Sequence, residues 1–282
     1  MNYLENYNND AIKIASSLNF EQKLESARVS LSNKLTQPPP VLQIDNMSEH
    51  LVTICTEGNI SVIKGIAKSR KSFLVAMLTA ASISDKIIYQ KFISIPKKLV
   101  VYFDTEQSSF YVQQAIYRIH AISNGNGFET RFYSFCLRPY TPAERLEMIE
   151  YVFEKFKNLG FVVIDGIRDL IRDINSPEES TMISSKLLKW SERSGAHIMT
   201  VLHENISDGK LRGHIGTELM NKAETVIRVE KDKDDPSISK ISCDMVRGLD
   251  FDPIYFRVND NIPEVISKNY AQQKWIEWII TN

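Results

Sequence analysis

The 282-residue sequence predicts an α/β protein with a mainly parallel central sheet, antiparallel strands towards the C-terminus and a helical arm at the N-terminus. Two observations carry this prediction. Short apolar runs alternate with helical stretches from about residue 50 onward, and four runs (SVI, VVYF, FVVI and IMTVL) are apolar on both faces. Strands buried on both faces are typical of a parallel sheet that is covered by helices.

The elements follow in order along the chain. Residues 1–44 form the expected arm, with Ala11, Ile14 and Leu18 on one helical stripe and Leu24, Val29 and Leu31 in a second, weaker pattern. The run QPPP at 37–40 stops any helix and sets an extended linker. The main domain is expected over 45–268. Its strands are predicted at 51–55, 60–63, 99–103, 131–135, 161–164, 197–202, 225–229, 241–245 and 254–258. Its helices are predicted near 71–84, 108–123, 142–157 and 178–193, with a short one at 214–222. Residues 269–282 predict a closing helix with Trp275 and Trp278 as packing anchors.

Composition excludes several classes of protein. Lys plus Arg number 34 and Asp plus Glu 35, so the net charge is −1, and 43% of residues are hydrophobic. These values are typical of a globular protein and argue against a disordered chain or a basic protein that coats nucleic acid. No apolar run approaches a membrane span and no signal peptide is visible, so we expect no membrane partner and a cytoplasmic location. The cysteines (Cys55, Cys136 and Cys243) are few and far apart, which indicates free residues.

A loop between an expected strand and an expected helix carries the first chemical motif. The run GIAKSRKS at 65–72 follows the strand ISVIK and precedes the helix SFLVAMLTAA. It matches the phosphate-loop pattern G-x-x-x-x-G-K-[ST] except at Arg70, which replaces the second glycine. Backbone N–H groups at a helix start, together with the helix dipole, favour phosphate. The candidate residues for binding ATP are Gly65, Lys68, Ser69, Arg70, Lys71 and Ser72.

Within this loop, Lys71 is expected to reach the β- and γ-phosphates and Ser72 to hold Mg²⁺. If the loop requires a positive φ at Arg70, the cost is roughly 1 kcal/mol, and the compensation would be one more cation near the phosphates. The plainer interpretation of the octet is a basic surface turn before a helix.

Two buried strands end in carboxylates. VVYF is followed by Asp104-Thr105-Glu106, and FVVI is followed by Asp165. Ligands of open α/β sheets bind at the carboxyl ends of the strands, beside the phosphate loop. Asp165 is therefore expected to hold Mg²⁺, and Glu106 to act as the general base that activates water. Strand-ending Asp residues can also simply cap the next turn.

The strand at 197–202 ends in His203, which is our candidate sensor of the γ-phosphate, although a hydrogen-bonded strand-end histidine is the alternative. The polar loop that follows, ISDGKLRG at 206–213, has two glycines and two cations. A loop of this kind is expected to be mobile and to couple the phosphate state to a second ligand.

In this order the motifs resemble the RecA-type P-loop ATPases. The catalytic Glu106 lies on a strand next to that of Asp165 rather than directly after it, which separates this class from the AAA+ class. The segments KSRK and RGHIGTEL more closely resemble the RepA-like hexameric helicases, of the type carried on Bacteroidetes mobile elements. The resemblance covers roughly residues 45–260.

The resemblance implies an ATPase, and a DNA helicase in particular, that assembles as a homo-oligomeric hexameric ring around single-stranded DNA. An arginine finger would complete each site in trans, for which Arg247 is the first candidate and Arg212 the second. Lys210 and Arg212 would contact DNA. The alternatives are a RecA-fold regulatory ATPase that switches protein partners without moving on DNA, and a scaffold that binds nucleotide without hydrolysing it.

Overall fold

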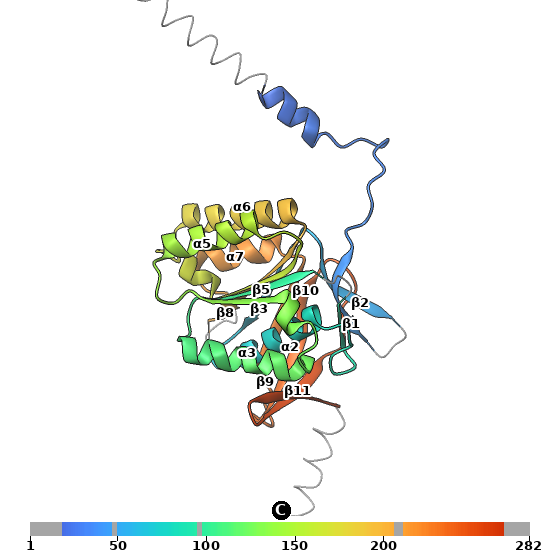
Figure 1. Cartoon of the computed structure of the whole chain (residues 1–282), viewed down its shortest axis with the longest axis vertical. Coiled ribbons are helices and arrows are strands. Elements are labelled where there is room, and N and C mark those ends of the chain that lie inside the picture. Colours follow the sequence, from blue (N-terminus) through green and yellow to red (C-terminus); the bar gives the residue numbers. More distant parts are fainter. Residues whose placement is uncertain (1–18, 47–49, 95–97, 206–210, 268–282) are drawn as a thin grey trace, which may run out of the picture. The chain divides into compact units, whose positions relative to one another are not determined.

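The computed structural model describes residues 19–46, 50–94, 98–205 and 211–267 (Figure 1). Contacts divide the chain into two compact units, Met1–Gln37 and Pro38–Asn282. In the first unit, residues 19–27 are helical and include Leu24, but Val29 and Leu31 follow the helix and are exposed, so the second helical pattern is shorter than expected. The stripe of Ala11, Ile14 and Leu18 and the closing helix at 269–282 lie outside the described residues.

The second unit is built on a nine-stranded sheet, which confirms the α/β class with mostly parallel strands and antiparallel C-terminal strands. Six neighbouring strands are parallel, and the last three pair antiparallel at one side. In spatial order the strands are β12 (Ile262–Ile266), β11 (Ile254–Asn259), β10 (Ile238–Val246), β9 (Thr225–Lys231), β3 (Ile60–Gly65), β8 (His197–His203), β7 (Leu159–Asp165), β5 (Leu99–Asp104) and β6 (Phe132–Cys136).

Helices cover both faces of the parallel part (Figure 1). One face carries α2 (Lys71–Ile83) and α3 (Ser109–Ser123), and the other carries α5 (Pro142–Lys155), α6 (Pro177–Ser194) and α7 (Gly213–Lys222). The short helices α4 (Phe128–Arg131) and η1 (Ile167–Leu170) lie in connections. Because strand side chains alternate, Ile63 packs with α2 while Val62 packs on the opposite face.

Three strands were not predicted. β1 (Pro40–Asp45) pairs with β2 (Leu51–Thr56) and with β4 (Phe92–Ser94) in a separate three-stranded sheet, so residues 40–44 are part of the folded unit rather than of a linker. Of these three strands, β1 and β4 belong to the small sheet. The remaining one, β12, forms a hairpin with β11 through Asp260 and Asn261, both at positive φ. In the described part of the chain, no helix has the length and apolar character that a bilayer span requires.

Candidate functional site

The phosphate-loop motif connects β3 to α2, as its sequence indicates. Gly65 ends β3, and a Cβ there would lie 2.2 Å from the Val229 carbonyl oxygen, so no larger residue fits. Lys68 (φ 64°) and Arg70 (φ 74°) have left-handed backbone conformations. Arg70 is the N-cap of α2, and no side chain caps the helix start. The first N–H groups of α2 are therefore not satisfied by a capping side chain, which is the arrangement that favours an anion.

Arg70 adopts the positive φ that the glycine of the motif would take, so the anticipated strain is present. Its guanidinium donates hydrogen bonds to the carbonyl oxygen of Ser237 (2.8 Å) and to the hydroxyl of Ser239 (3.0 Å). The side chain is thus tied to β10 and the residues before it. These bonds, rather than an additional charge aimed at phosphate, are the visible compensation for the strain.

Lys71 is buried at the start of α2, and its ammonium contacts three groups. It donates to the carbonyl oxygens of Gly65 and Ile66, both at 2.9 Å, and lies 3.0 Å from Nδ1 of His203. Burial lowers the pKa of Lys71 to about 8, although the carboxylates of Asp165 and Glu106 oppose this shift. At neutral pH the amine therefore keeps its proton and donates to the loop that precedes it.

The carboxylates of Asp104 and Asp165 end the neighbouring strands β5 and β7, where the two residues pair across the sheet. The Tyr102 hydroxyl lies 2.9 Å from Oδ2 of Asp104 and 3.2 Å from Oδ2 of Asp165. Burial, followed by the charges of Asp104 and Glu106, raises the pKa of Asp165 to about 7. The site thus concentrates negative charge, which a bound cation would relieve.

The turn after β5 fixes Glu106. Asp104 Oδ1 accepts hydrogen bonds from the backbone N–H groups of Glu106 (3.0 Å) and Gln107 (2.8 Å). Thr105 donates to the Gly166 carbonyl oxygen at 2.8 Å, which ties the turn to the end of β7. A Cβ on Gly166 would lie 2.2 Å from the Thr105 hydroxyl, so this close approach requires glycine.

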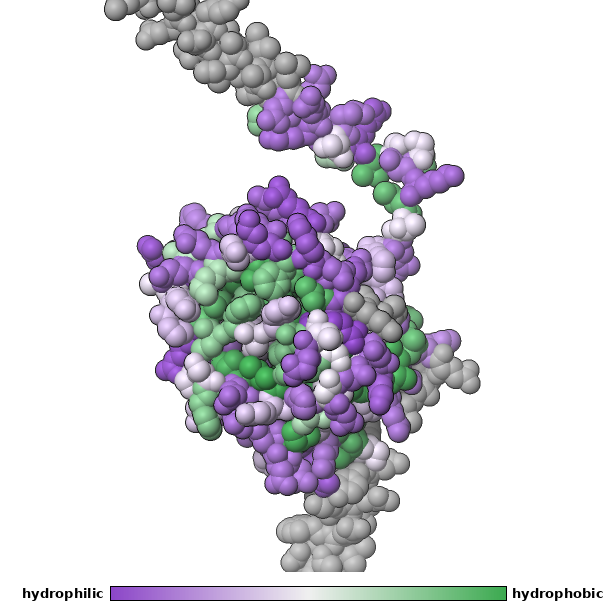
Figure 2. Space-filling model, viewed as in Figure 1, coloured by the Kyte–Doolittle hydropathy of each residue, from purple (hydrophilic) through white to green (hydrophobic). Residues whose placement is uncertain are grey.

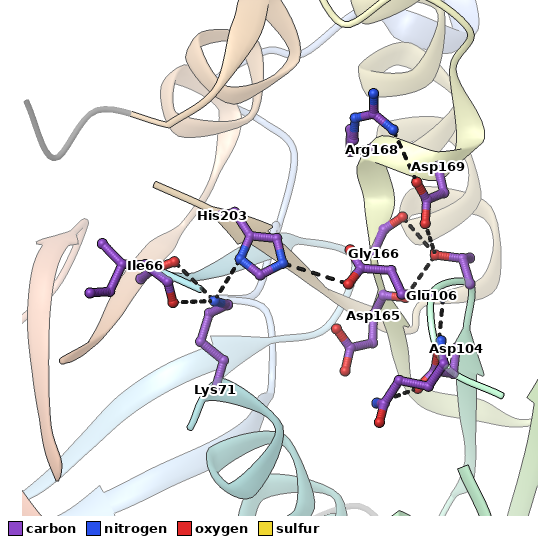
Figure 3. A network of polar contacts seen from close by, with 12 residues as sticks. Ile66, Lys71, Asp104, Glu106, Asp165, Gly166, Arg168, Asp169 and His203 are labelled. Atoms are coloured by element: carbon purple, nitrogen blue, oxygen red, sulfur yellow. Dashed lines mark hydrogen bonds and ion pairs between the residues drawn. The ribbon is translucent and has the colours of Figure 1, made fainter. Parts of the chain in front are cut away.

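His203 lies between the loop and the acidic side of the site (Figure 3). Its Nε2 is 3.6 Å from Oε2 of Glu106, and its Nδ1 faces the Lys71 ammonium. Because the ammonium can only donate, Nδ1 accepts and Nε2 carries the proton that points to Glu106. Contact with His203 holds the pKa of Glu106 below its usual value, against the effect of burial. Glu106 is therefore ionised at neutral pH.

These groups surround one cavity of about 300 Å³ at the carboxyl ends of β3, β8, β7 and β5. Most of the predicted site residues meet there, and the structure adds Phe73 and Gln107. The lining residues are Lys68, Ser69, Arg70, Lys71, Ser72, Phe73, Glu106, Gln107, Asp165 and His203.

The predicted cations beyond the cavity are distributed differently. The backbone N–H of Arg212 donates to the His203 carbonyl oxygen (3.3 Å), and the Arg212 charge contributes to lowering the pKa of Lys71. Arg247 is exposed and directly follows β10, whose Val246 pairs with Thr225 at the start of β9. Arg247 therefore lies near the amino ends of the parallel strands, whereas the cavity lies at their carboxyl ends. It does not belong to the cavity of its own chain. Lys210 lies outside the described residues.

An ionic cluster that was not expected from the sequence is made of Lys64, Glu204, Arg228 and Asp244; Lys64 and Glu204 are buried, Arg228 is half-buried and Asp244 is exposed. The Lys64 ammonium lies 2.6 Å from Asp244 and 3.2 Å from Glu204, and Glu204 is 3.3 Å from Arg228. Lys64 directly precedes Gly65 and Glu204 directly follows His203, so the cluster joins the two strand ends that form the phosphate side of the cavity. A lysine in the apolar run ISVIK was the signal in the sequence.

Comparison with known proteins assigns no family. No protein-family model matches this chain, and the search of curated proteins finds no match.

Proposed function

We propose that this protein binds ATP together with Mg²⁺ in the 300 Å³ cavity and hydrolyses it. The observation that carries the proposal is the convergence of a phosphate loop, two strand-end carboxylates and a histidine on one cavity. The loop and the carboxylates come from distant parts of the sequence, which makes a chance arrangement of surface residues a poor explanation.

The loop fits a polyphosphate. The uncapped start of α2 supplies N–H donors, and the Ser69 hydroxyl is buried without a hydrogen-bond partner. The Lys71 ammonium is held by two carbonyl oxygens of its own loop and by His203, and it would exchange these acceptors for phosphate oxygens. His203 would then lose its contact with Lys71, so its state would report whether phosphate is bound.

The acidic side of the cavity fits Mg²⁺. Among the described residues, no group of three or more His, Cys, Asp or Glu could hold a metal by itself. Mg²⁺ commonly uses one or two protein groups together with substrate phosphates, and Ser72 and Asp165 both line the cavity. Ser72 and Asp165 would hold the ion, and when bound it would offset the charge of the phosphates.

Glu106 is the group best placed to act on water. Its carboxylate is ionised, its backbone is fixed by Asp104, and it faces the cavity opposite Lys71. Glu106 would orient the attacking water and accept its proton, while the ring of His203 holds the Glu106 carboxylate in position.

Turnover measurements test this proposal. Wild-type protein should release phosphate from ATP only when Mg²⁺ is present. Lys71→Ala should lose both nucleotide binding and turnover, whereas Glu106→Gln should bind nucleotide and turn it over at least about 100-fold more slowly. Lys189→Ala on the exposed side of α6 is the matched control and should change neither. Equal rates for wild type and Glu106→Gln would remove Glu106 from the mechanism.

We further propose that the protein is a RecA-type P-loop ATPase, related to the RepA-like ring helicases of mobile elements. The strand order supports this, because β8 separates β3 from β7 and Glu106 follows the strand beside that of Asp165. In a hexameric ring, the exposed Arg247 would be free to enter the site of a neighbour as an arginine finger. Arg212, bonded to the backbone of His203, would contact single-stranded DNA together with Lys210.

Single-stranded DNA should then stimulate turnover and bind with salt-dependent affinity, each neutralised phosphate contributing about −0.7 to the log–log slope. Arg212→Ala should weaken binding and reduce the slope by about that amount. If DNA neither binds nor stimulates, the regulatory ATPase that acts on protein partners becomes the better proposal.

A further inference from the structure

A second cavity, larger than the nucleotide cavity, lies between the edge strand β6 and α5. Its volume is about 510 Å³, which is within the range of ligand-binding pockets. It shares no lining residue with the nucleotide cavity. We call it the β6–α5 groove, and its lining residues are Phe103, Phe135, Leu137, Tyr140, Glu144, Glu147, Met148, Tyr151, Val152 and Phe156.

The chemistry of the groove is that of a protein interface. Aromatic, aliphatic and methionine side chains form most of the lining, with two carboxylates beside them. Tyr140 is 41% exposed and Tyr151 is 58% exposed. Figure 2 shows hydrophobic residues gathered on this face of the molecule. Aromatic and methionine side chains that gather at a surface in this way are enriched at binding interfaces.

The chain itself contains a segment that matches this surface. Residues 268–282, which lie outside the described residues, have the sequence KNYAQQKWIEWIITN. Trp275, Trp278 and Ile279 have the i, i+3, i+4 spacing of one helical face. Tryptophan is the side chain most typical of interface hot spots, and Lys274 beside Trp275 would complement Glu144 and Glu147.

The described chain ends too far from its own groove for this segment to occupy it. β12 and β6 are the two edges of the nine-stranded sheet, eight strand spacings apart, which is roughly 38 Å. Trp275 lies nine residue steps after Ile266, which span roughly 30 Å at full extension. β12 also runs antiparallel to the parallel strands, whereas Leu137 and Tyr140 follow the carboxyl end of β6, which increases the separation further.

We propose that the C-terminal segment 268–282 of one copy docks in the β6–α5 groove of a second copy, with Trp275 and Trp278 as its anchors. The two contacting surfaces differ, so the contact is head-to-tail and builds a closed ring or an open array rather than a two-fold dimer. This inference does not rest on the proposed nucleotide site, and it is tested without nucleotide.

The first test is molar mass by sedimentation of the full chain as a function of concentration. Wild type should form species larger than the 32.3 kDa monomer. The tail variant Trp275→Ala/Trp278→Ala and the groove variant Tyr140→Ala/Tyr151→Ala should each remain monomeric. The control Tyr111→Ala/Tyr117→Ala removes two tyrosines that are each 59% exposed on α3, and it should assemble as wild type does.

Mixing identifies the partner surface. The tail variant keeps an intact groove and the groove variant keeps an intact tail, so together they should form a dimer through one intact contact. If the groove variant is monomeric while the tail variant assembles normally, another segment fills the groove and the proposal is wrong. A mixture that stays monomeric also contradicts it.

A binding measurement keeps the proposal testable if assembly depends on further contacts. A fluorescein-labelled peptide of residues 268–282 should bind the full-length tail variant, measured by anisotropy. Adding Tyr140→Ala/Tyr151→Ala to that chain should weaken binding about tenfold or more, whereas adding Tyr111→Ala/Tyr117→Ala should not. No binding, or equal affinity for both chains, would overturn the inference.

Discussion

Replacing Asp165 by Asn should stabilise the folded protein at neutral and alkaline pH while it abolishes turnover. Asp165 is half-buried at the end of β7, where it lines the cavity beside the carboxylates of Asp104 and Glu106. These surroundings suit a cation-binding site and oppose a charged carboxylate when no cation is bound. The variant Asp165→Asn keeps the shape of the side chain and removes its ionisation.

The magnitude follows from the pKa of Asp165, which rises from 3.8 to about 7 on folding. The folded state therefore holds this proton more tightly than the unfolded state, and the contribution to stability falls as pH rises from about 4 to about 7. A difference of about 3 pKa units corresponds to roughly 4 kcal/mol, lost in full above pH 7. Asn does not ionise, so the variant does not lose stability over this pH range. Desolvation of the Asn amide reduces the net gain in stability over wild type to about 2–4 kcal/mol.

Thermal or urea unfolding at pH 4.5 and pH 8 measures this effect. At pH 8, Asp165→Asn should be more stable than wild type by at least about 2 kcal/mol, or roughly 4 °C in Tm, and at pH 4.5 the difference should nearly vanish. Asp234→Asn, on an exposed loop, is the matched control and should stay within about 0.5 kcal/mol at both values. A variant less stable than wild type at pH 8, or a gain that does not change with pH, would refute the reasoning about this carboxylate.

Three further predictions concern residues around the sheet. Arg70→Gly and Arg70→Ala both lose the hydrogen bonds to Ser237 and Ser239, so the difference in stability between the two variants isolates the effect of the left-handed backbone. The glycine variant should be more stable than the alanine variant by about 1 kcal/mol in urea unfolding, and equal stability would contradict strain at this position. Burial lowers the pKa of His197 to about 4, so between pH 8 and pH 5 the histidine takes up a proton in the unfolded state but not in the folded state. The free energy of unfolding of wild type should therefore fall by roughly 2 kcal/mol relative to that of His197→Gln over this range. Parallel curves of stability against pH would disprove this. Lys64→Met should cost about 3 kcal/mol because it leaves the buried Glu204 with a single cationic partner, whereas Lys240→Met, in a half-exposed pair with Glu230, should cost less than about 1 kcal/mol. Similar losses for both would count against a stabilising role of the buried Lys64–Glu204 pair.

Much of the parallel core was predictable because its strands are apolar on both faces and end in polar residues. VVYF before Asp104 and FVVI before Asp165 became β5 and β7 as predicted, and their carboxyl ends meet beside the phosphate loop. The rule that parallel strands bring their carboxyl ends to one edge was sufficient to bring together Lys71, Glu106 and Asp165.

Other elements gave weak signals. β1 begins at a proline, β4 has three residues, and β12 contains Pro263, so none is a typical strand by composition. The turn Asp260-Asn261 between β11 and β12 was the one usable signal, since these residues accept the positive φ of a two-residue hairpin. Lys64 in the apolar run ISVIK was a signal of a buried lysine, but its partners Glu204 and Asp244 could not be predicted, because they are distant in the sequence.

The contacts that offset the backbone strain at Arg70 could also not be predicted from the sequence. The sequence indicates a departure from the phosphate-loop pattern and the backbone strain that it implies. It does not indicate that Ser237 and Ser239, more than 160 residues away, accept hydrogen bonds from the guanidinium.

The most direct test of the account is the rate of Mg²⁺-dependent ATP hydrolysis for wild type and Lys71→Ala, with Lys189→Ala as the matched control. We expect measurable turnover by wild type and by Lys189→Ala, and a loss of at least about 100-fold in Lys71→Ala. A wild-type protein that neither binds nor hydrolyses ATP, or a Lys71→Ala variant as active as wild type, would contradict the assignment of the cavity at the carboxyl ends of β3, β8, β7 and β5 as a nucleotide site.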